Sequence, residues 1–186
     1  VRQESPALLE RSVLLAVEAM RRAPSLEADQ VLRKGLQLLP RVLQRQLHAR
    51  PVEVVRFSRD GLRWAAGGRD GVVRVCAVGD AADATTITVG AEVRDLVLSG
   101  NGQLVVTASG DGVARIWELP GGGLRSALPS GTSLARVRFS VDESMFATAS
   151  WDGTVAIWET ATGREVMRVR HDAAVLHLAF APSGDP

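Results

Sequence analysis

The chain has little sulfur and few aromatic rings: its 186 residues include one cysteine, no tyrosine and 4% aromatic residues. One cysteine excludes an internal disulfide framework, so we expect the protein to work in the reducing cytoplasm. No apolar run approaches the roughly 18 residues of a membrane span, and no signal peptide pattern stands at the start. The formal net charge of +1 lacks the one-signed basic character expected of a nucleic-acid or anionic-membrane binder. We therefore expect neither nucleic acid nor membrane as a partner.

What the chain does contain is an internal repeat of 41 residues. One anchor is an apolar residue before a small residue, at Phe57-Ser58, Leu98-Ser99, Phe139-Ser140 and Phe180-Ala181. A second anchor is Asp-Gly at Asp70, Asp111 and Asp152, and a third is Cys76, Trp117 and Trp158. A repeat near this length, with Asp-Gly before an aromatic residue, is the sequence signature of a propeller blade.

Each complete copy predicts four short antiparallel strands, from runs rich in β-branched and aromatic residues between turn residues. The first strands are predicted over 52–57, 93–98, 134–139 and 175–180, and the second over 62–67, 104–109 and 145–150. The third strands are predicted over 72–76, 113–117 and 154–158, and the fourth over 85–89, 126–128 and 165–170. In every first strand one apolar residue falls out of the two-residue alternation, which predicts a bulge there.

The copy from Phe139 to Trp158, with Trp151-Asp152-Gly153 at its turn, carries the clearest family likeness. It resembles the WD40 repeat family, and the resemblance covers roughly residues 41–186. The resemblance implies a mainly β fold: an incomplete WD40 β-propeller of about three four-stranded blades plus the first strand of a fourth. The copies lie near 48–89, 90–130, 131–170 and 171–186.

The resemblance also implies a hydrogen-bonded set inside each blade, formed by a histidine, a Ser/Thr, the turn aspartate and a tryptophan. By position its members here are His48, Asp70, Thr107, Asp111, Trp117, Thr148, Asp152, Trp158 and His171. None of the copies holds all four members, since Ala66 and Cys76 occupy two places in the first copy and Val89 and Ser130 replace the histidine in the next two.

Residues 1–40 differ in character and predict a short α-helical hairpin, with Ser5-Pro6 opening one helix and Ser25 a second. An outer strand is expected over 41–47. Residues 14–24 resemble the linker that precedes propellers in bacterial signalling proteins, where a STAND-type NTPase or a TIR, caspase-like or kinase module lies upstream. The chain therefore has the pattern of a fragment of a longer protein.

We expect no catalytic site, no metal and no cofactor. The three histidines do not form a metal-ligand pattern; His48 and His171 are assigned to blade hydrogen bonding and His177 to a partly buried strand. A serine, a histidine and an aspartate could be combined on paper as Ser109, His171 and Asp152, but each already has a structural assignment.

Binding is the remaining class of function, because propellers present the loops of one rim on a rigid mount. The rim positions that the family exposes are Glu53, Arg69, Glu92, Arg94 and Trp151. The sequence thus predicts a non-catalytic scaffold or sensor that binds a protein or peptide. The alternative is the regulatory C-terminal region of a bacterial signalling enzyme. Because the blades would not close a ring, we also expect contact with further blades of the parent chain, or self-association.

Overall fold

The computed structural model describes residues 47–181, and these form twelve β-strands without a helix among them. The predicted helical hairpin over 1–40, and all but the last residue of the strand expected over 41–47, lie outside the described residues. The predicted mainly β character is confirmed for the part that the structure describes.

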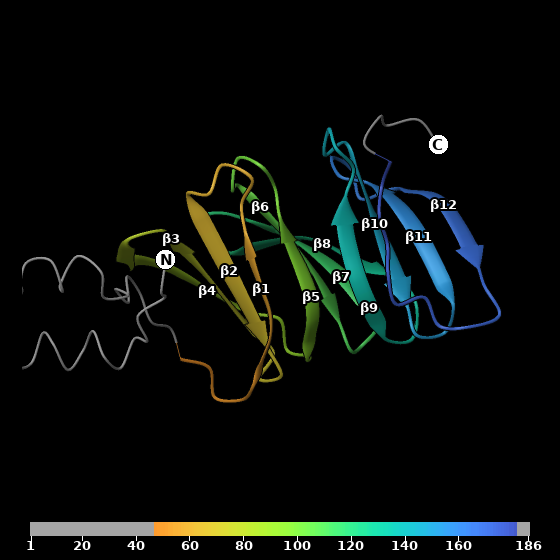
Figure 1. Ribbon diagram of the computed structural model, residues 1–186, viewed down its shortest axis with the longest axis horizontal. Coiled ribbons are helices and arrows are strands. Elements are labelled where there is room, and N and C mark those ends of the chain that lie inside the picture. Colours follow the sequence, from red (N-terminus) through yellow and green to blue (C-terminus); the bar gives the residue numbers. More distant parts are fainter. Residues whose placement is uncertain (1–46, 182–186) are drawn as a thin grey trace, which may run out of the picture. The chain divides into compact units, whose positions relative to one another are not determined.

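The strands form three four-stranded antiparallel sheets, each in chain order (Figure 1). The first sheet contains β1 (Val52–Phe57), β2 (Arg63–Gly68), β3 (Val72–Ala77) and β4 (Asp80–Thr88). The second contains β5 (Val93–Leu98), β6 (Leu104–Ser109), β7 (Val113–Glu118) and β8 (Gly123–Pro129). The third contains β9 (Leu134–Phe139), β10 (Met145–Ser150), β11 (Thr154–Glu159) and β12 (Glu165–Arg170). We call these sheets the first, second and third blades.

The first strand of each blade is bulged, as the broken alternation predicts. The pairing register shifts between Val52 and Val54 in β1 and between Val93 and Asp95 in β5. In the third blade the shift lies opposite Ala149 and Ser150 of β10. A bulge bends the strand and turns its following side chains, so it sets where the charged residues of these strands point.

A serine closes the first hairpin of every blade. In the third blade, the Ser140 hydroxyl donates to Asp142 Oδ1 at 2.7 Å, and its oxygen accepts from Met145 N at 3.1 Å. Ser58 and Ser99 do the same in the other two blades. The first two turns place glycine at positive φ, while the third places Glu143 there at φ 61°. The Glu143 carboxylate accepts a hydrogen bond from Gly100 N at 2.6 Å, a contact between blades that offsets the cost of this backbone conformation.

The predicted first strand of a fourth blade is wrong: residues 175–180 form no strand. A strand needs a neighbour to satisfy its backbone groups, and none of the twelve described strands pairs with this segment. The segment instead meets the third blade at one backbone hydrogen bond, from Val175 N to Ser150 O at 3.1 Å.

The apolar cores lie between neighbouring blades. Between the first and second blades, Val73, Val75 and Ile87 pack with Leu96 and Trp117. Between the second and third blades the buried side chains include Val106, Ile116, Leu134, Val137, Phe146 and Trp158. Each fully buried side chain of this size contributes roughly 1.5–3 kcal/mol. The blades therefore hold one another by side chains, while their backbone hydrogen bonds stay within each blade.

Candidate functional site

The second and third blades each contain a tryptophan that is bonded to a threonine. Trp117 Nε1 donates to Thr107 Oγ1 at 3.0 Å, and Trp158 Nε1 donates to Thr148 Oγ1 at 3.2 Å. All four side chains are buried. These side-chain hydrogen bonds link the third strand of the blade to the second, in addition to the backbone hydrogen bonds between the two strands.

The first blade contains the other half of the set. His48 Nδ1 lies 3.1 Å from Asp70 Oδ2, and Asp70 also accepts from Ala49 N at 3.0 Å. His48 Nε2 is buried and has no hydrogen-bond partner among the described residues. Ala66 stands where the other two blades have threonine, so the first blade lacks the hydroxyl that the family resemblance would pair with this histidine.

The turn aspartates find different partners in each blade. Asp111 has no histidine to pair with and binds Arg115 Nη2 at 2.6 Å instead. Asp152 accepts from the backbone N–H groups of Thr154, at 2.9 Å, and Thr132, at 3.1 Å. The hydrogen bond from Thr154 N, with further donors that outweigh partial burial, lowers the pKa of Asp152 from 3.8 to about 2.

His171 is placed apart from the rest of the set. Its side chain is exposed, and its backbone N–H donates to Gly153 O at 2.9 Å. His177, expected as a partly buried strand residue, is exposed and lies in the segment that forms no strand. That expectation failed for the same reason as the fourth strand, because no paired neighbour covers the segment.

Four of the five rim residues form one network of ion pairs across the first two blades. Arg69, in the turn between β2 and β3, contacts Glu53 of β1 and lies 3.1 Å from Glu92 Oε1. Glu92, just before β5, binds Arg94 Nη2 through its other oxygen at 2.9 Å. The hydrogen bond that Arg69 donates to Glu53, together with the charges of Glu53 and Glu92, raises the pKa of Arg69. Solvent-exposed pairs of this kind contribute little to stability, so the network can exchange partners at little cost.

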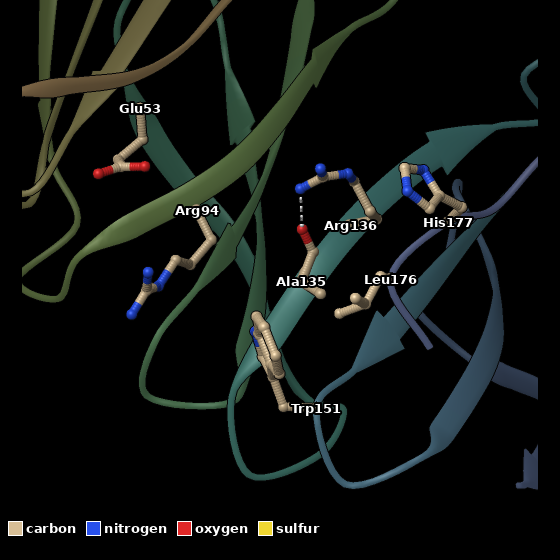
Figure 2. Close-up of a pocket in the computed structure, with 7 residues that line it drawn as sticks. All are labelled: Glu53, Arg94, Ala135, Arg136, Trp151, Leu176 and His177. Carbon is tan, nitrogen blue, oxygen red and sulfur yellow. Dashed lines mark hydrogen bonds between the residues drawn. The ribbon is translucent and has the colours of Figure 1, made fainter. Parts of the chain in front are cut away.

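Trp151 lies in the turn after β10 and is 53% exposed. It lines a hollow of about 300 Å³ together with Glu53, Arg94, Ala135, Arg136, Leu176 and His177 (Figure 2). The hollow thus brings together side chains from all three blades and from the segment after β12. Three of the five rim residues meet there, while Arg69 and Glu92 do not line the hollow but bind Glu53 and Arg94.

Sequence reasoning missed Arg136 and Leu176, which line the hollow, and it missed a buried charge in the first strands. Asp95 of β5 is 1% exposed and binds Arg56 of β1 at 3.0 Å and Arg138 of β9 at 2.5 Å. One carboxylate therefore links the first strands of all three blades. The signal for Arg136 and Asp95 lies at one repeat position. That position holds Val54 in the first copy but the charged residues Asp95 and Arg136 in the next two copies.

Within residues 47–181, no group of three side chains from His, Cys, Asp and Glu is placed to bind a metal ion. The same residues contain no helix with the length and apolar character needed to cross a bilayer.

Comparison with known families finds repeats in two parts of the chain. Residues 85–118 and 129–159 match the family described as WD domain, G-beta repeat. The first match covers the end of β4 and the strands β5, β6 and β7, and the second covers β9, β10 and β11. No curated protein matches the chain. The second and third blades are thus similar to WD repeats in both sequence and strand order.

Proposed function

We propose that this chain is a non-catalytic interaction module that binds a protein or peptide at one rim of its blades. The binding surface is the rim cluster, formed by Glu53, Arg69, Glu92, Arg94 and Trp151. Repeats similar to the two matched segments typically mediate contacts between proteins. The proposal includes no catalysis and no cofactor, and it places the module in the cytoplasm.

The observation that carries the proposal is the meeting of Glu53, Arg94 and Trp151 around one hollow. They come from three different copies, up to 98 positions apart in sequence. Tryptophan and arginine are enriched among the residues that dominate binding energy at protein interfaces. An exposed indole beside a hollow of this size offers apolar surface on which a partner side chain can pack. The surrounding charged groups can orient the partner through hydrogen bonds and ion pairs.

Nucleic acid fits this rim less well than protein does. The four charged residues of the rim cluster are two arginines and two glutamates, already paired with one another. A phosphate backbone is bound by a one-signed basic surface whose counterions are released on binding. Mixed, paired charges favour a protein or peptide with charges of its own.

We further propose that the outer blades contact additional blades of the parent chain or other copies of this chain. Phe57 of β1 is 63% exposed, whereas its equivalent in the second blade, Leu98, is 5% exposed; Val169 of β12 is 39% exposed, whereas its equivalent, Leu128, is 9% exposed. Sedimentation across a range of protein concentrations tests this idea, and a monomer at every concentration would contradict self-association.

The alternative, the regulatory end of a bacterial signalling enzyme, is supported by the likeness of residues 14–24 to such linkers. These residues lie outside the described ones. A phosphate-loop motif or a protease-like, TIR or kinase domain in the upstream reading frame would favour this alternative, and it is compatible with binding at the rim cluster.

The rim is tested by selecting a random-peptide phage library against the protein and measuring each selected peptide on two variants. Trp151→Ala removes the indole from the hollow, and we expect it to weaken binding at least tenfold, the loss typical of a dominant interface residue. Leu124→Ala is the matched control, because Leu124 is also 53% exposed but lies on β8, an outer strand. Peptides that bind Trp151→Ala as well as they bind the original protein would contradict the proposal.

A further inference from the structure

Charge is unevenly balanced around the hollow. Glu53 and Glu92 are both neutralised by Arg69, and Glu92 also by Arg94. Within the rim cluster two negative charges therefore meet two positive ones. Arg136, which lines the same hollow, adds a charge that this network does not balance.

Arg136 has spare hydrogen-bonding capacity. Its Nη1 donates to the carbonyl oxygen of Ala135 at 2.8 Å, the dashed line in Figure 2, and it forms no ion pair with any described residue. A guanidinium carries five N–H donors in a planar fork. Most of these donors remain available to a group that enters the hollow.

Arg94 adds a second unused donor. Its Nη2 is held by Glu92, but its Nε is buried and has no hydrogen-bond partner among the described residues. A buried donor without an acceptor costs free energy, and an acceptor supplied by a partner would remove that cost. Each of the two arginines thus has a donor without a protein acceptor among the described residues, while the carboxylate that lines the hollow, that of Glu53, is held by Arg69.

Apart from His177 and Glu53, the rest of the lining is apolar. Trp151, Leu176 and Ala135 line the hollow beside the arginines. A ligand that fits this combination has a carboxylate and an apolar group next to it. Arginine binds carboxylates through paired, charge-assisted hydrogen bonds, which are roughly twice as strong as neutral ones.

We infer that the partner of this rim is a peptide segment with a carboxylate beside an apolar residue, the carboxylate binding Arg136 and Arg94 and the apolar residue packing on Trp151. This inference rests on the proposed function, because it names the occupant of the same hollow. A carboxylate can come from an aspartate or glutamate side chain or from a chain terminus; the chemistry is shared, and the experiment separates the two sources.

The probes are three pools of fluorescein-labelled hexapeptides with random flanking residues. One pool has a fixed central glutamate and an amidated end, one a fixed central glutamine and an amidated end, and one a fixed central glutamine and a free carboxylate end. We expect one of the two carboxylate pools to bind about tenfold more tightly than the amidated glutamine pool, and raised salt to reduce that preference. Preference for the first pool identifies a side chain, and preference for the third identifies a chain terminus.

Two variants locate the effect. Arg136→Gln should abolish the carboxylate preference while leaving the weaker binding to the amidated glutamine pool, which depends on Trp151. Arg164→Gln makes the same change in net charge at a 72% exposed arginine outside the hollow, and it should keep the preference.

The outcomes separate this inference from the proposed function. Equal binding of all three pools, still weakened by Trp151→Ala, would overturn the carboxylate and leave the rim intact. A carboxylate preference that survives Arg136→Gln would also overturn the inference. Tight binding of an oligothymidylate that displaces the peptides would assign the donors to phosphate instead. Absence of binding by every pool and every selected peptide would overturn the proposed function itself.

Discussion

The first and third blades have the same strand order, yet they are held together by opposite halves of one hydrogen-bonded set. The first blade has His48 against Asp70 without the threonine and tryptophan. The third blade has Trp158 against Thr148 without the histidine. Because the backbone is the same in both, the blade does not require the complete set. Its strand ladders and the apolar contacts with neighbouring blades carry most of the fold, and the side-chain set adds to them.

The third blade should nevertheless depend more on its aromatic residue. Trp158 stacks on Phe146 with ring centroids 6.5 Å apart, and the Arg168 guanidinium lies 5.9 Å from the centre of its ring. The equivalent residue of the first blade, Cys76, is also fully buried but much smaller. The third blade should therefore lose more stability than the first when its buried aromatic residue is removed.

The largest effect is expected from removing the buried indole. Trp158→Ala should lower the free energy of unfolding by about 3–5 kcal/mol, since it leaves a cavity and removes the donor that Thr148 Oγ1 accepts from. Cys76→Ala, at the same position in the first blade, should cost only about 1 kcal/mol. Urea unfolding followed by far-ultraviolet circular dichroism measures both. A cost below about 1 kcal/mol for Trp158→Ala would show that the third blade does not depend on this side chain.

The turn glycine of the third blade comes next. Gly153 has φ +86°, and a Cβ there would overlap the carbonyl oxygen of His171. Gly153→Ala should therefore cost about 3 kcal/mol, from both backbone strain and displacement of the neighbouring segment. Gly79 of the first blade has φ +84° with open space around it, so Gly79→Ala should cost about 1–2 kcal/mol from strain alone. Equal costs would mean that the contact with His171 is unimportant.

The pH dependence of the third blade should follow Asp152. Its folded pKa is lowered to about 2, below the ordinary 3.8, so its contribution to stability is complete above about pH 4. That contribution is lost as the pH falls from about 4 through 2. The melting temperature of the protein should therefore fall more steeply over this window than that of Asp152→Asn. Parallel curves in differential scanning calorimetry would exclude this role.

The smallest effect is a gain in the first blade. Ala66→Thr would place a hydroxyl where the other blades have one, and we expect it to stabilise the protein by about 1 kcal/mol by satisfying His48 Nε2. The same substitution in a His48→Ala background provides the control in a double-mutant cycle. A gain of the same size in both backgrounds would show that the threonine acts through strand propensity and not through the histidine.

Much of the blade architecture could be predicted from the spacing of 41 residues. The strands β1, β5 and β9 begin and end where the apolar and β-branched runs predict, and so do β6, β10 and β12. The bounds of the fourth strands β4 and β8 were predicted less accurately. β4 begins at Asp80, five residues earlier than expected, because Gly79 at φ +84° turns the chain directly after β3. The predicted strand over 175–180 is wrong because pairing needs a neighbour, which a local pattern cannot supply.

The candidate site was predictable only in part. The repeat positions selected Glu53, Arg94 and Trp151, which the structure brings to one hollow. Arg136 was overlooked because its place in the repeat holds Val54 in the first copy, where the side chain is buried. The pairing of Asp95 with two arginines was also missed. The three residues lie on three different strands, about one repeat apart in sequence, so no local motif contains them together.

The strands of each blade, their bulges, the glycine turns and the buried tryptophans can be predicted within one repeat, because each follows from side-chain periodicity and turn chemistry. How charges are shared between blades follows instead from the folded arrangement of the repeats. Arg69 pairs with two glutamates, and the carboxylate of Asp95 lies between two arginines. Arg136 has N–H donors that form no ion pair with a described residue. Each of these arrangements depends on distances between repeats. A charged or hydrogen-bonding side chain pairs with the groups that lie near it in space. The repeating sequence shows which residue types are present, but not which of them lie close to one another in the fold.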